Sequence, residues 1–458
     1  MADHAAIVLA AGKGKRMKSM LPKPLHPLAG RPMVCHVLAT VASTRPKRCV
    51  VVTAPAFAGA MAAAIGEVPV ALQRRPLGTG HAVLAARETM AGFTGDVLVL
   101  FADTPLLRRE TLRALLAARR SDGDAAVAVL GFRPRDPARY GRLVCDAAGR
   151  LEAIVEYDDA DAAVRQIGLC NAGAMAVDGG ILFALLDSIG SCNAQEEYYL
   201  TDIVAAARRA GRVARVVEAD EDELMGVDTR AGLARAEAEL QQRLRQAAME
   251  GGATLVAPET VFLSHDTRLG RDVVVHPHVV FGPGVEVAAG AEIRSFSHLE
   301  GCRVAAGARI GPFARLRPEA EIGPDAHIGN FVEVKKARIE AGAKVNHLTY
   351  IGDARVGERA NVGAGTITCN YDGFNKDFTD IGNDAFIGSN TALVAPVKVG
   401  DGAIIGAGSV ITEEVPAEAL ALTRAPQKSI AGFAKGYRKR KAAQKAAGAK
   451  SGSSSKQA

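Results

Sequence analysis

The chain of 458 residues is 48% hydrophobic and 23% charged, and these globular proportions exclude a wholly disordered protein. The formal net charge is +6, but residues 435–458 contain eight Lys and Arg and no acid, so the remaining body carries 6 − 8 = −2. A near-neutral body without Trp and with 5% aromatic residues disfavours nucleic acid as a partner, because nucleic-acid readers present basic folded faces and stacking side chains.

The chain up to about residue 228 alternates short apolar runs with helix-like segments. The predicted strands are Ile7–Ala11, Cys49–Thr53, Val68–Leu72 and Val97–Phe101, and the predicted helices between them are Met33–Thr40 and Gly80–Met90. Such alternation indicates a mostly parallel sheet with helices on both faces. Residues 230–250 are rich in helix formers, lack Pro and precede a Gly pair, so we expect a helical linker between a domain at 1–229 and a domain at 251–458.

The second domain follows a six-residue period of apolar residues with a few short steps and one interruption. The repeating positions are Leu263, Leu269, Val275, Phe281, Val287, Ile293, Leu299, Val304, Ile310, Leu316, Ile322, Ile328, Val334, Ile339, Val345, Ile351, Val356, Val362, Thr368, Ile381, Ile387, Leu393, Val399, Ile405 and Ile411. This period fits neither a helix nor an alternating strand, and it is typical of a parallel β-helix of hexapeptide repeats with about eight coils. From about residue 435 we expect a frayed, basic, low-complexity tail.

The seven cysteines are scattered without CxxC spacing, which is typical of a reducing compartment and predicts neither a disulfide framework nor a zinc site. No apolar run reaches the roughly 18 residues of a membrane-spanning helix. The first apolar stretch, Ala5–Ala11, precedes its lysines, the reverse of a signal peptide. We therefore expect a cytoplasmic, soluble protein without a membrane partner.

A glycine turn with basic residues follows the first predicted strand, in the segment Leu9–Met17. Such a turn frees backbone N–H groups for phosphate, and Lys13, Arg16 and Lys23 add positive charge. The segment matches neither GxGxxG nor GxxxxGK[ST]. From these residues alone, a phosphate site and an ordinary turn between strand and helix are equally good interpretations.

A carboxylate, Asp103, follows the buried run Val97–Phe101 at the position where ligand sites of α/β sheets lie. Carboxylates suit Mg²⁺, which takes few protein oxygens and adds substrate phosphates. A capping role before Thr104 is an equally good interpretation of this aspartate from the local sequence.

Polar residues also recur on one edge of the predicted β-helix. Arg317 and Lys335 are 18 residues apart, so three hexads per coil would stack them about 4.8 Å apart on adjacent coils. Stacked cations repel unless an anion bridges them, so a phosphate ligand is expected. His347 and Tyr350 lie one coil further on, and an imidazole is a natural base for taking a proton from an attacking amine. A structural histidine is the alternative.

The hexads break only between Thr368 and Ile381, where residues 369–380 form an irregular segment that we expect to carry Asn370 and Tyr371 away from the core. A loop that leaves a repeat structure is more often functional than accidental, and a tolerated insertion is the alternative.

Several motifs resemble those of a known family. Leu9–Met17 with Pro22-Lys23 resembles the signature of sugar-nucleotide pyrophosphorylases. The motifs Gln73, Leu77–His81, Tyr140–Arg142, Ile154–Glu156, Asn171 and Glu197–Asp202 are similar to one branch, the bifunctional bacterial enzyme that joins N-acetylglucosamine-1-phosphate uridylyltransferase to glucosamine-1-phosphate N-acetyltransferase. The resemblance covers residue 5 to about 430 and implies an α/β nucleotide-binding (Rossmann-like) pyrophosphorylase domain, a linker helix and a left-handed β-helix acetyltransferase domain.

The resemblance implies roles for single residues of the first domain. It places UTP and UDP-N-acetylglucosamine on Leu9, Ala10, Ala11, Gly12, Lys23, Gln73, Gly78, Thr79, Asp103, Gly141, Glu156, Asn171 and Asp228, with Mg²⁺ on Asp103 and Asp228. Alignment and charge neutralisation by Mg²⁺, Arg16 and Lys23 would supply most of the catalysis. The chain departs from the family pattern at Lys15, often Thr, at Ala102, usually Gly, and at Asp228, commonly Asn.

The motifs Arg315–Pro318, Val334–Lys336, His347–Tyr350 and Gly365–Asp372 resemble the acetyltransferase half of the same enzyme. The resemblance implies His347 as the catalytic base. It also implies a glucosamine-1-phosphate site at Arg317, Lys335, Tyr350 and Asn361, and an acetyl-CoA site at Ala364, Asn370, Tyr371, Ser389, Ala407 and Arg424.

We therefore expect a bifunctional enzyme that acetylates glucosamine-1-phosphate from acetyl-CoA and couples the product to UTP with release of pyrophosphate. By its family role it would supply UDP-N-acetylglucosamine for bacterial peptidoglycan and lipopolysaccharide synthesis. The resemblance further implies a homotrimer. The alternatives are a monofunctional sugar-1-phosphate nucleotidylyltransferase with a structural β-helix, and a non-enzymatic assembly subunit.

Overall fold

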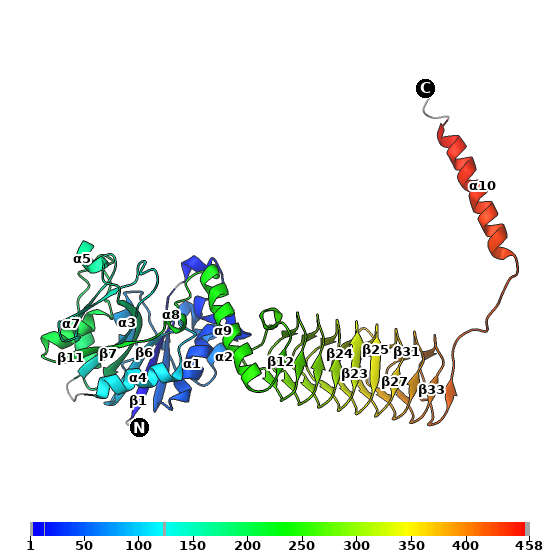
Figure 1. Ribbon diagram of the computed structural model, residues 1–458, viewed down its shortest axis with the longest axis horizontal. Helices are drawn as coiled ribbons and strands as arrows, with labels where there is room; N and C mark the ends of the chain where they lie inside the picture. The colour runs from blue at the N-terminus through cyan, green and yellow to red at the C-terminus, as the bar shows by residue number, and fades with distance from the viewer. Residues whose placement is uncertain (1–2, 13, 122–124, 454–458) are drawn as a thin grey trace. The chain divides into compact units, whose positions relative to one another are not determined.

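The structure is a computed structural model that describes residues 3–12, 14–121 and 125–453, with side chains as far as residue 447. Lys13, one of the expected phosphate-binding cations, therefore lies outside the described residues. The chain forms two compact units, Met1–Glu319 and Ala320–Ala458. The first unit contains an α/β sheet, the long helix α9 (Arg230–Glu250) and the first coils of a repeat structure, and the second contains the later coils (Figure 1). Helix α9 occupies the range expected for the linker, while the division into domains at residues 229 and 250 stays a prediction.

A nine-stranded sheet forms the centre of the α/β part. Its strands are β1 (His4–Leu9), β4 (Arg48–Thr53), β5 (Val70–Leu72), β6 (Asp96–Phe101), β7 (Ala125–Phe132), β8 (Arg142–Cys145), β9 (Leu151–Val155), β10 (Cys170–Asp178) and β11 (Val213–Glu218). The main order is β11-β7-β10-β6-β1-β4-β5, and β10 runs antiparallel to both of its neighbours. Strands β8 and β9 form an antiparallel pair beside β10, and the short strands β2 (Pro27–Leu28) and β3 (Arg31–Pro32) pair separately. The predicted mostly parallel sheet is confirmed.

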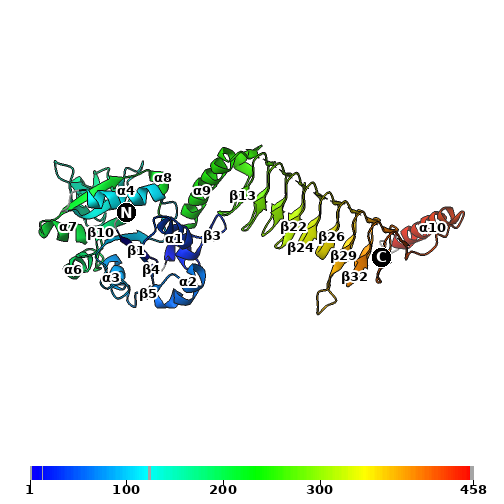
Figure 2. The same ribbon diagram turned by 90° about the horizontal axis from the view of Figure 1, so that it is seen from below.

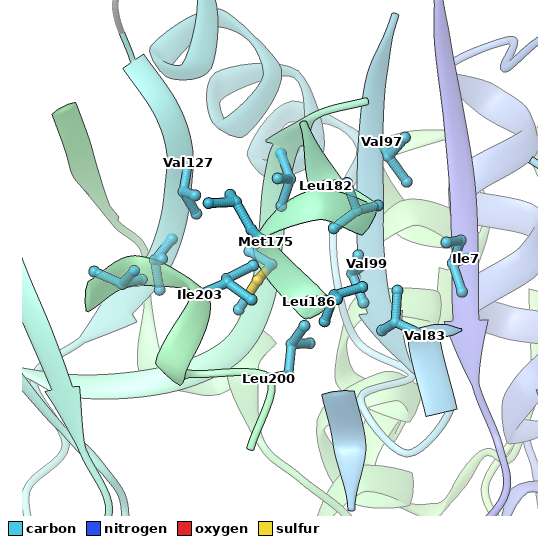
Figure 3. Packing of buried hydrophobic residues seen from close by; sticks show 14 of the residues in the cluster. Ile7, Val83, Val97, Val99, Val127, Met175, Leu182, Leu186, Leu200 and Ile203 are labelled. Atoms are coloured by element: carbon cyan, nitrogen blue, oxygen red, sulfur yellow. The ribbon is translucent and has the colours of Figure 1, made fainter. Parts of the chain in front are cut away.

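Helices cover both faces of this sheet, which explains why every residue of β1 is buried. The helices are α1 (Met33–Ser43), α2 (Ala58–Ile65), α3 (Thr79–Leu84), α4 (Arg109–Arg120), α5 (Ala162–Arg165), α6 (Leu182–Asp187), α7 (Asp202–Arg209) and α8 (Glu221–Leu224), with the 3₁₀ turns η1 (Lys15–Met17), η2 (Lys23–Leu25) and η3 (Pro55–Phe57). Ile7 of β1 belongs to the core under α3, α6 and α7, whereas its neighbour Val8 belongs to the core under α1, α2 and α4. Figure 3 shows the first of these cores, where Ile7, Val99, Met175 and Leu186 pack together.

One predicted helix is shorter than expected. We expected Gly80–Met90, but α3 ends at Leu84. The next backbone N–H groups donate three residues back, from Ala86 to Val83 and from Arg87 to Leu84, so the chain continues in tighter turns.

The coils of the first unit are built from two-residue strands that pair in parallel with strands of the next coil. One row contains β12 (Thr254–Leu255), β14 (Val274–Val275), β17 (Glu292–Ile293) and β20 (Arg309–Ile310). The other rows contain β13 (Arg268–Leu269), β16 (Glu286–Val287) and β19 (Arg303–Val304), and β15 (Val280–Phe281), β18 (His298–Leu299) and β21 (Arg315–Leu316). A 3₁₀ turn, η4 (Pro258–Thr260), lies in the first coil.

The second unit continues with the same kind of parallel rows. One row contains β23 (His327–Asn330), β25 (Lys344–His347), β27 (Asn361–Val362), β30 (Phe386–Ile387), β33 (Ile404–Ile405) and β35 (Leu420–Ala421). The other strands are β22 (Ala320–Ile322), β24 (Glu333–Ile339), β26 (Tyr350–Val356), β28 (Ile367–Cys369), β29 (Thr379–Ile381), β31 (Ala392–Val394), β32 (Val397–Val399) and β34 (Val410–Ile411). Between β28 and β29 a loop leaves the regular coils (Figure 2).

The hexapeptide pattern is confirmed, because every repeating position predicted from the sequence is buried except Leu269, which is partly exposed. The polar exception, Thr368, is buried as well. Its Oγ1 accepts from the backbone nitrogen of Gly352 at 2.8 Å and donates to the carbonyl oxygen of Gly352 at 3.1 Å, so its hydroxyl is satisfied inside the coil. The left-handed sense of the β-helix stays a prediction.

The expectation of a frayed tail from residue 435 is wrong for residues 435–453, which belong to helix α10 (Phe433–Ser453). The segment contains several Ala and Lys residues, which have high helix propensity. Stacking of the Phe433 and Tyr437 rings, with centroids 6.1 Å apart, adds an i,i+4 contact to its first turns. Across the described residues, no helix is long and apolar enough to cross a membrane.

Candidate active sites

The predicted nucleotide-binding residues meet at the carboxyl ends of β1 and β6. The chain passes from β1 to β4 on one side and later returns from β5 to β6 on the other side of β1, and ligands of α/β sheets bind at such switch points. A cavity of about 350 Å³ lies there. Its lining contains the predicted Leu9, Ala10, Ala11, Gly12, Lys23, Gln73, Gly78, Thr79 and Asp103, together with Pro24, Pro76, Ala82, Phe101 and Glu197, which the sequence did not identify as site residues.

A chain of opposite charges runs along one side of this cavity. Lys23 Nζ donates to Asp103 Oδ2 and, at 2.9 Å, to Asp228 Oδ1, and Arg16 Nη2 lies 3.0 Å from Asp228 Oδ2. Burial alone would lower the pKa of Lys23, but the pKa is raised because the charges and hydrogen bonds of Asp103 and Asp228 prevail. Lys23 is therefore a firmly protonated cation at the cavity wall. Arg16 and Asp228 are not among the described residues that line the cavity. Asp228 contacts the lining residue Lys23, and Arg16 contacts Asp228.

Two glycines allow the backbone to take the conformation that it has around the cavity. Gly14 has φ of 57°, and a Cβ built there would lie 2.6 Å from Cβ of Lys23. Gly78 has φ of 106°, and its Cβ would lie 2.6 Å from the carbonyl oxygen of Tyr198. Only glycine fits either position, because L-residues combine strain at this φ with a steric clash.

The loop before α3 is held against a distant segment of the chain. Thr79 Oγ1 accepts from the backbone nitrogen of Leu200 at 2.9 Å, and Gln73 Nε2 donates to the carbonyl oxygen of Gly78 at 2.9 Å. Gln73 Nε2 also lies 3.2 Å from His81 Nδ1. Three predicted residues thus form one wall whose position depends on residues 198–200.

Gly141, Glu156 and Asn171, three of the residues predicted to hold UTP and UDP-N-acetylglucosamine, form a second cluster beside the antiparallel strands β8, β9 and β10. The backbone nitrogen of Asn171 donates to the carbonyl oxygen of Gly141 at 2.8 Å. A Cβ on Gly141 would lie 3.1 Å from Glu156 Oε2, so Gly141 packs directly on that carboxylate. Thr201 Oγ1 donates to Glu156 Oε1 at 3.3 Å. Burial is the largest cause that raises the pKa of Glu156, and the negative charges of nearby aspartates raise it further. The hydrogen bond from Thr201 opposes this shift without reversing it.

The donor set fits Mg²⁺ with help from substrate. Asp103 and Asp228 turn carboxylate oxygens toward one cationic position, which Lys23 Nζ marks, and oxygen ligands are what Mg²⁺ prefers. The described residues contain no cluster of three or more His, Cys, Asp or Glu side chains that could hold a metal alone. A metal would therefore complete its shell with phosphate oxygens and water.

The three departures from the family pattern have different consequences. Ala102 is buried and its backbone nitrogen donates to the carbonyl oxygen of Leu9 at 3.0 Å, so the extra methyl group is accommodated. Lys15 is an exposed residue of η1. Asp228 adds a full negative charge that Arg16 and Lys23 balance.

The second candidate site lies on the coils of the second unit. Lys335 and Tyr350 belong to neighbouring strands β24 and β26, where Lys335 pairs with Gly352 and Tyr350 with Glu333. His347 ends β25 and is exposed, and Asn361 begins the next strand of its row, β27. The structure therefore brings these residues to consecutive coils. Arg317 belongs to the first unit, directly after β21, and its stacking on Lys335 stays a prediction.

The predicted acetyl-CoA residues form a ladder across further coils. The backbone nitrogen of Asn390, next to Ser389, donates to the carbonyl oxygen of Ala364 at 2.7 Å. Gly408, next to Ala407, donates to the carbonyl oxygen of Ser389 at 2.8 Å. Arg424 Nη1 donates to the carbonyl oxygen of Ala407 at 2.8 Å, so an exposed cation ends the ladder.

The loop between β28 and β29 corrects one expectation. We expected it to carry both Asn370 and Tyr371 away from the core, but Asn370 is only 8% exposed and donates through Nδ2 to Asp353 Oδ2 at 2.5 Å. This buried polar pair keeps Asn370 on the coils. Tyr371 is 60% exposed, and its hydroxyl donates to the carbonyl oxygen of Gly373 at 2.6 Å.

Comparison with known proteins agrees with both parts of the chain. Residues 6–167 match the MobA-like NTP transferase domain family, and residues 378–413 match the bacterial transferase hexapeptide (six repeats) family. The protein named bifunctional protein GlmU from Paramagnetospirillum magneticum is 60% identical over 96% of this chain and 98% of its own length. Proteins with the same name from Rhodospirillum rubrum, 61% identical over 96% of this chain and 98% of its own length, and from Maricaulis maris, 58% identical over 97% and 98%, are similar throughout. The chain therefore belongs to the GlmU family of bifunctional uridylyltransferase and acetyltransferase enzymes in UDP-N-acetylglucosamine synthesis.

Proposed function

We propose that the cavity at the ends of β1 and β6 is the uridylyl-transfer site and that the coils around His347 carry the acetyl-transfer site. The observation that supports the first assignment most strongly is the convergence of the glycine turn Leu9–Gly12, the cation Lys23 and the carboxylate Asp103 on one cavity. A turn that presents backbone N–H groups beside a cation suits the triphosphate of UTP.

Uridylyl transfer needs alignment and charge neutralisation more than proton transfer. An oxygen of the sugar phosphate attacks the α-phosphorus of UTP, the bond to the β-phosphate breaks, and pyrophosphate leaves with its electron pair. The attacking oxygen is already ionised at neutral pH, so no general base is required. Lys23 and Arg16 would stabilise the charge that moves onto pyrophosphate.

We propose that Asp103 and Asp228 hold Mg²⁺ in this site. The metal, when bound, would neutralise phosphate charge and hold the phosphates in line. Because Lys23 donates to both carboxylates, its side chain would turn toward the phosphates when the metal binds. Lys23 would then keep a charged partner in both states.

Acetyl transfer needs a base. The amine nitrogen of glucosamine-1-phosphate attacks the thioester carbonyl of acetyl-CoA, the proton of the amine passes to His347, and CoA leaves as the thiolate. Lys335 is a cation one coil away that suits the sugar phosphate, and Tyr350 lies on the strand that pairs with its own. Asn361 lies on the strand that pairs with β25, the strand of His347. The ladder Ala364, Ser389, Ala407 and Arg424 suits the extended CoA molecule. Cys369 is not needed as a nucleophile.

The assembly we propose is a homotrimer working in the cytoplasm, where UTP and acetyl-CoA are available. The loop between β28 and β29 presents Phe374, 91% exposed, and Phe378, 53% exposed, beside Tyr371. Apolar side chains exposed this far favour contact with another copy of the chain. Each acetyl-transfer site would then be built at a boundary between subunits.

The alternative of a monofunctional nucleotidylyltransferase is tested by assaying the two products separately. The protein is incubated with glucosamine-1-phosphate, acetyl-CoA, UTP and Mg²⁺, and free thiol and pyrophosphate are measured in parallel. We expect free thiol to be released even when UTP is omitted. We expect pyrophosphate to be released only when acetyl-CoA is present, or when N-acetylglucosamine-1-phosphate replaces glucosamine-1-phosphate. The monofunctional alternative would be correct if pyrophosphate is released with N-acetylglucosamine-1-phosphate but no mixture releases free thiol.

A further inference from the structure

His347 has a side-chain partner on the preceding coil of the second unit. Strands β23 and β25 pair in parallel, and the register sets Asn330 beside His347. His347 Nδ1 lies 2.8 Å from Asn330 Oδ1. Because the contact joins the ends of two paired strands, the regular coil fixes the positions of both Cα atoms.

The backbone around the histidine is held by the same coils. Leu348 donates its backbone nitrogen to the carbonyl oxygen of Asn330 at 3.1 Å. Thr349 Oγ1 donates to the carbonyl oxygen of His347 at 2.7 Å, and the backbone nitrogen of Gly365 donates to the same oxygen at 3.3 Å. Main chain and ring are therefore both fixed, although the ring itself is exposed.

The chemistry of this contact determines which ring nitrogen carries the hydrogen. An amide oxygen only accepts hydrogen bonds, so Nδ1 must be the donor, and the lone pair of the neutral ring is then on Nε2. Among the described residues, none hydrogen-bonds to Nε2 of His347. The basic nitrogen is therefore free to meet a substrate amine.

We propose that Asn330 is a positioning residue for acetyl transfer, which holds His347 in the Nδ1–H tautomer and aims Nε2 at the amine. This inference rests on the proposed role of His347 as the base. An exposed imidazole without a partner would rotate and sample both tautomers. The neutral amide gives direction without adding a negative charge beside the phosphate of the substrate.

Two variants at position 330 distinguish the effect of the hydrogen-bond acceptor from the effect of side-chain size. Asn330→Leu keeps a similar volume and removes the acceptor, whereas Asn330→Asp keeps an oxygen acceptor. We expect Asn330→Leu to lower kcat for acetyl transfer by roughly 10- to 100-fold, with the KM values of both substrates changed by less than about two-fold. We expect Asn330→Asp to retain most of the activity.

The tautomer is read directly by two-bond ¹H–¹⁵N correlation of protein labelled at histidine, with His347→Gln identifying the signal among the ten histidines. The full-length wild type should show protonated Nδ1 and unprotonated Nε2 at neutral pH, and so should Asn330→Asp. Asn330→Leu should show a mixture of tautomers. A merely structural role for Asn330 would slow the enzyme without changing this spectrum.

A control variant and a folding control accompany the measurements on the Asn330 variants. Asn383 also accepts a hydrogen bond on a coil of this unit, at 2.9 Å from the backbone nitrogen of Glu358, so Asn383→Leu should leave kcat unchanged. Uridylyl transfer, measured in every variant, reports whether the first unit is folded, and thermal unfolding followed by circular dichroism reports whether the coils are folded. Unchanged kcat and tautomer in Asn330→Leu, with acetyl transfer lost in His347→Gln, would overturn the role of Asn330 alone. Full acetyl transfer in His347→Gln would instead overturn the proposed function together with this inference.

Discussion

The backbone nitrogen of Val227 donates to the carbonyl oxygen of Asp103 at 2.8 Å. This single hydrogen bond joins the segment after β6 to the segment before α9, which are more than a hundred residues apart in the sequence. As a result, the carboxylates of Asp103 and Asp228 both reach Lys23. The charge balance of the proposed uridylyl site therefore depends on the contact between these two segments.

Replacing Asp228 by Asn should raise the Mg²⁺ requirement of uridylyl transfer. The carboxylate lies 3.0 Å from Arg16 Nη2 and 2.9 Å from Lys23 Nζ, and Asn keeps its shape without the charge. We expect the Mg²⁺ concentration for half-maximal rate to rise by roughly ten-fold, as measured by titrating pyrophosphate release. Chelation by EDTA should stop uridylyl transfer in both proteins and leave acetyl transfer unchanged.

The control for this experiment is Asp187→Asn, outside the proposed site, which removes the ion pair between Asp187, the last residue of α6, and Arg87. It should leave the Mg²⁺ requirement as it is. An unchanged requirement in Asp228→Asn would show that Asp228 does not contribute to metal binding.

Gly78→Ala should destabilise the protein and weaken UTP binding together. The new Cβ would lie 2.6 Å from the carbonyl oxygen of Tyr198, and φ of 106° is unfavourable for alanine. We expect a loss of at least about 2 kcal/mol in the free energy of unfolding, measured by denaturant titration, and a higher KM for UTP. Gly66→Ala shares a positive φ, 66°, but meets open space, so its smaller loss measures the backbone strain alone. Equal losses in both variants would contradict the steric argument.

The stability of the protein should fall below about pH 6.5 partly because of His4. This side chain is 3% exposed, and its Nε2 lies 2.8 Å from Thr44 Oγ1. Burial, together with the charge of Arg120, lowers the pKa of His4 against the opposite effect of Asp96 and Asp3. As the pH falls, His4 binds a proton in the unfolded chain before it does so in the folded protein. The free energy of unfolding therefore decreases between the ordinary histidine pKa and the lowered pKa of His4. Above the ordinary histidine pKa this contribution does not change with pH.

His4→Gln removes this contribution. The variant should be less stable at pH 7.5, but its melting temperature should fall less than that of the wild type between pH 7.5 and pH 5.5. The fall should not vanish, because burial also lowers the pKa values of His26 and His36. The exposed His298 offers a control, since His298→Gln should keep the wild-type fall. An undiminished fall in His4→Gln would contradict the assignment.

Two inactive variants should restore acetyl transfer when mixed, if each site combines residues of two chains. We expect His347→Ala and Tyr371→Ala to be inactive alone and partly active after subunit exchange, because some sites in the mixed trimer would combine intact residues. Sedimentation should give about three times the chain mass of 47.7 kDa. A mass near that of one chain, or no rescue in a proven mixed trimer, would contradict the shared site.

Much of the fold could be predicted because its signals are local. Each hexad carries its own apolar residue, so the buried positions follow from counting along the chain. The position of the nucleotide cavity also followed from local signals, since a glycine turn and a carboxylate come after β1 and β6. Ligand sites of such sheets gather at strand ends of this kind.

Other features depend on contacts that the sequence does not display. Asp228 is held near Asp103 by the Val227 hydrogen bond and by Lys23, which are contacts between segments far apart in the sequence, so the residues alone gave no reason to pair the two aspartates. The repeat positions Ile328 and Val345 place Asn330 beside His347, but Asn330 is one polar residue among many on the coils and no motif marked it as a partner of the histidine. The buried position of Asn370 depends on its contact with Asp353, which the break in the hexads concealed.

Two chemically independent sites share this chain in the proposed function, and paired assays of two variants test their independence most directly. His347→Ala and Asp103→Ala are each supplied with both sets of substrates, and thiol and pyrophosphate release are measured. We expect His347→Ala to lose acetyl transfer by about 100-fold or more and to keep uridylyl transfer, and Asp103→Ala to show the reverse. Loss of both activities in a folded His347→Ala protein, or full acetyl transfer without His347, would contradict the account.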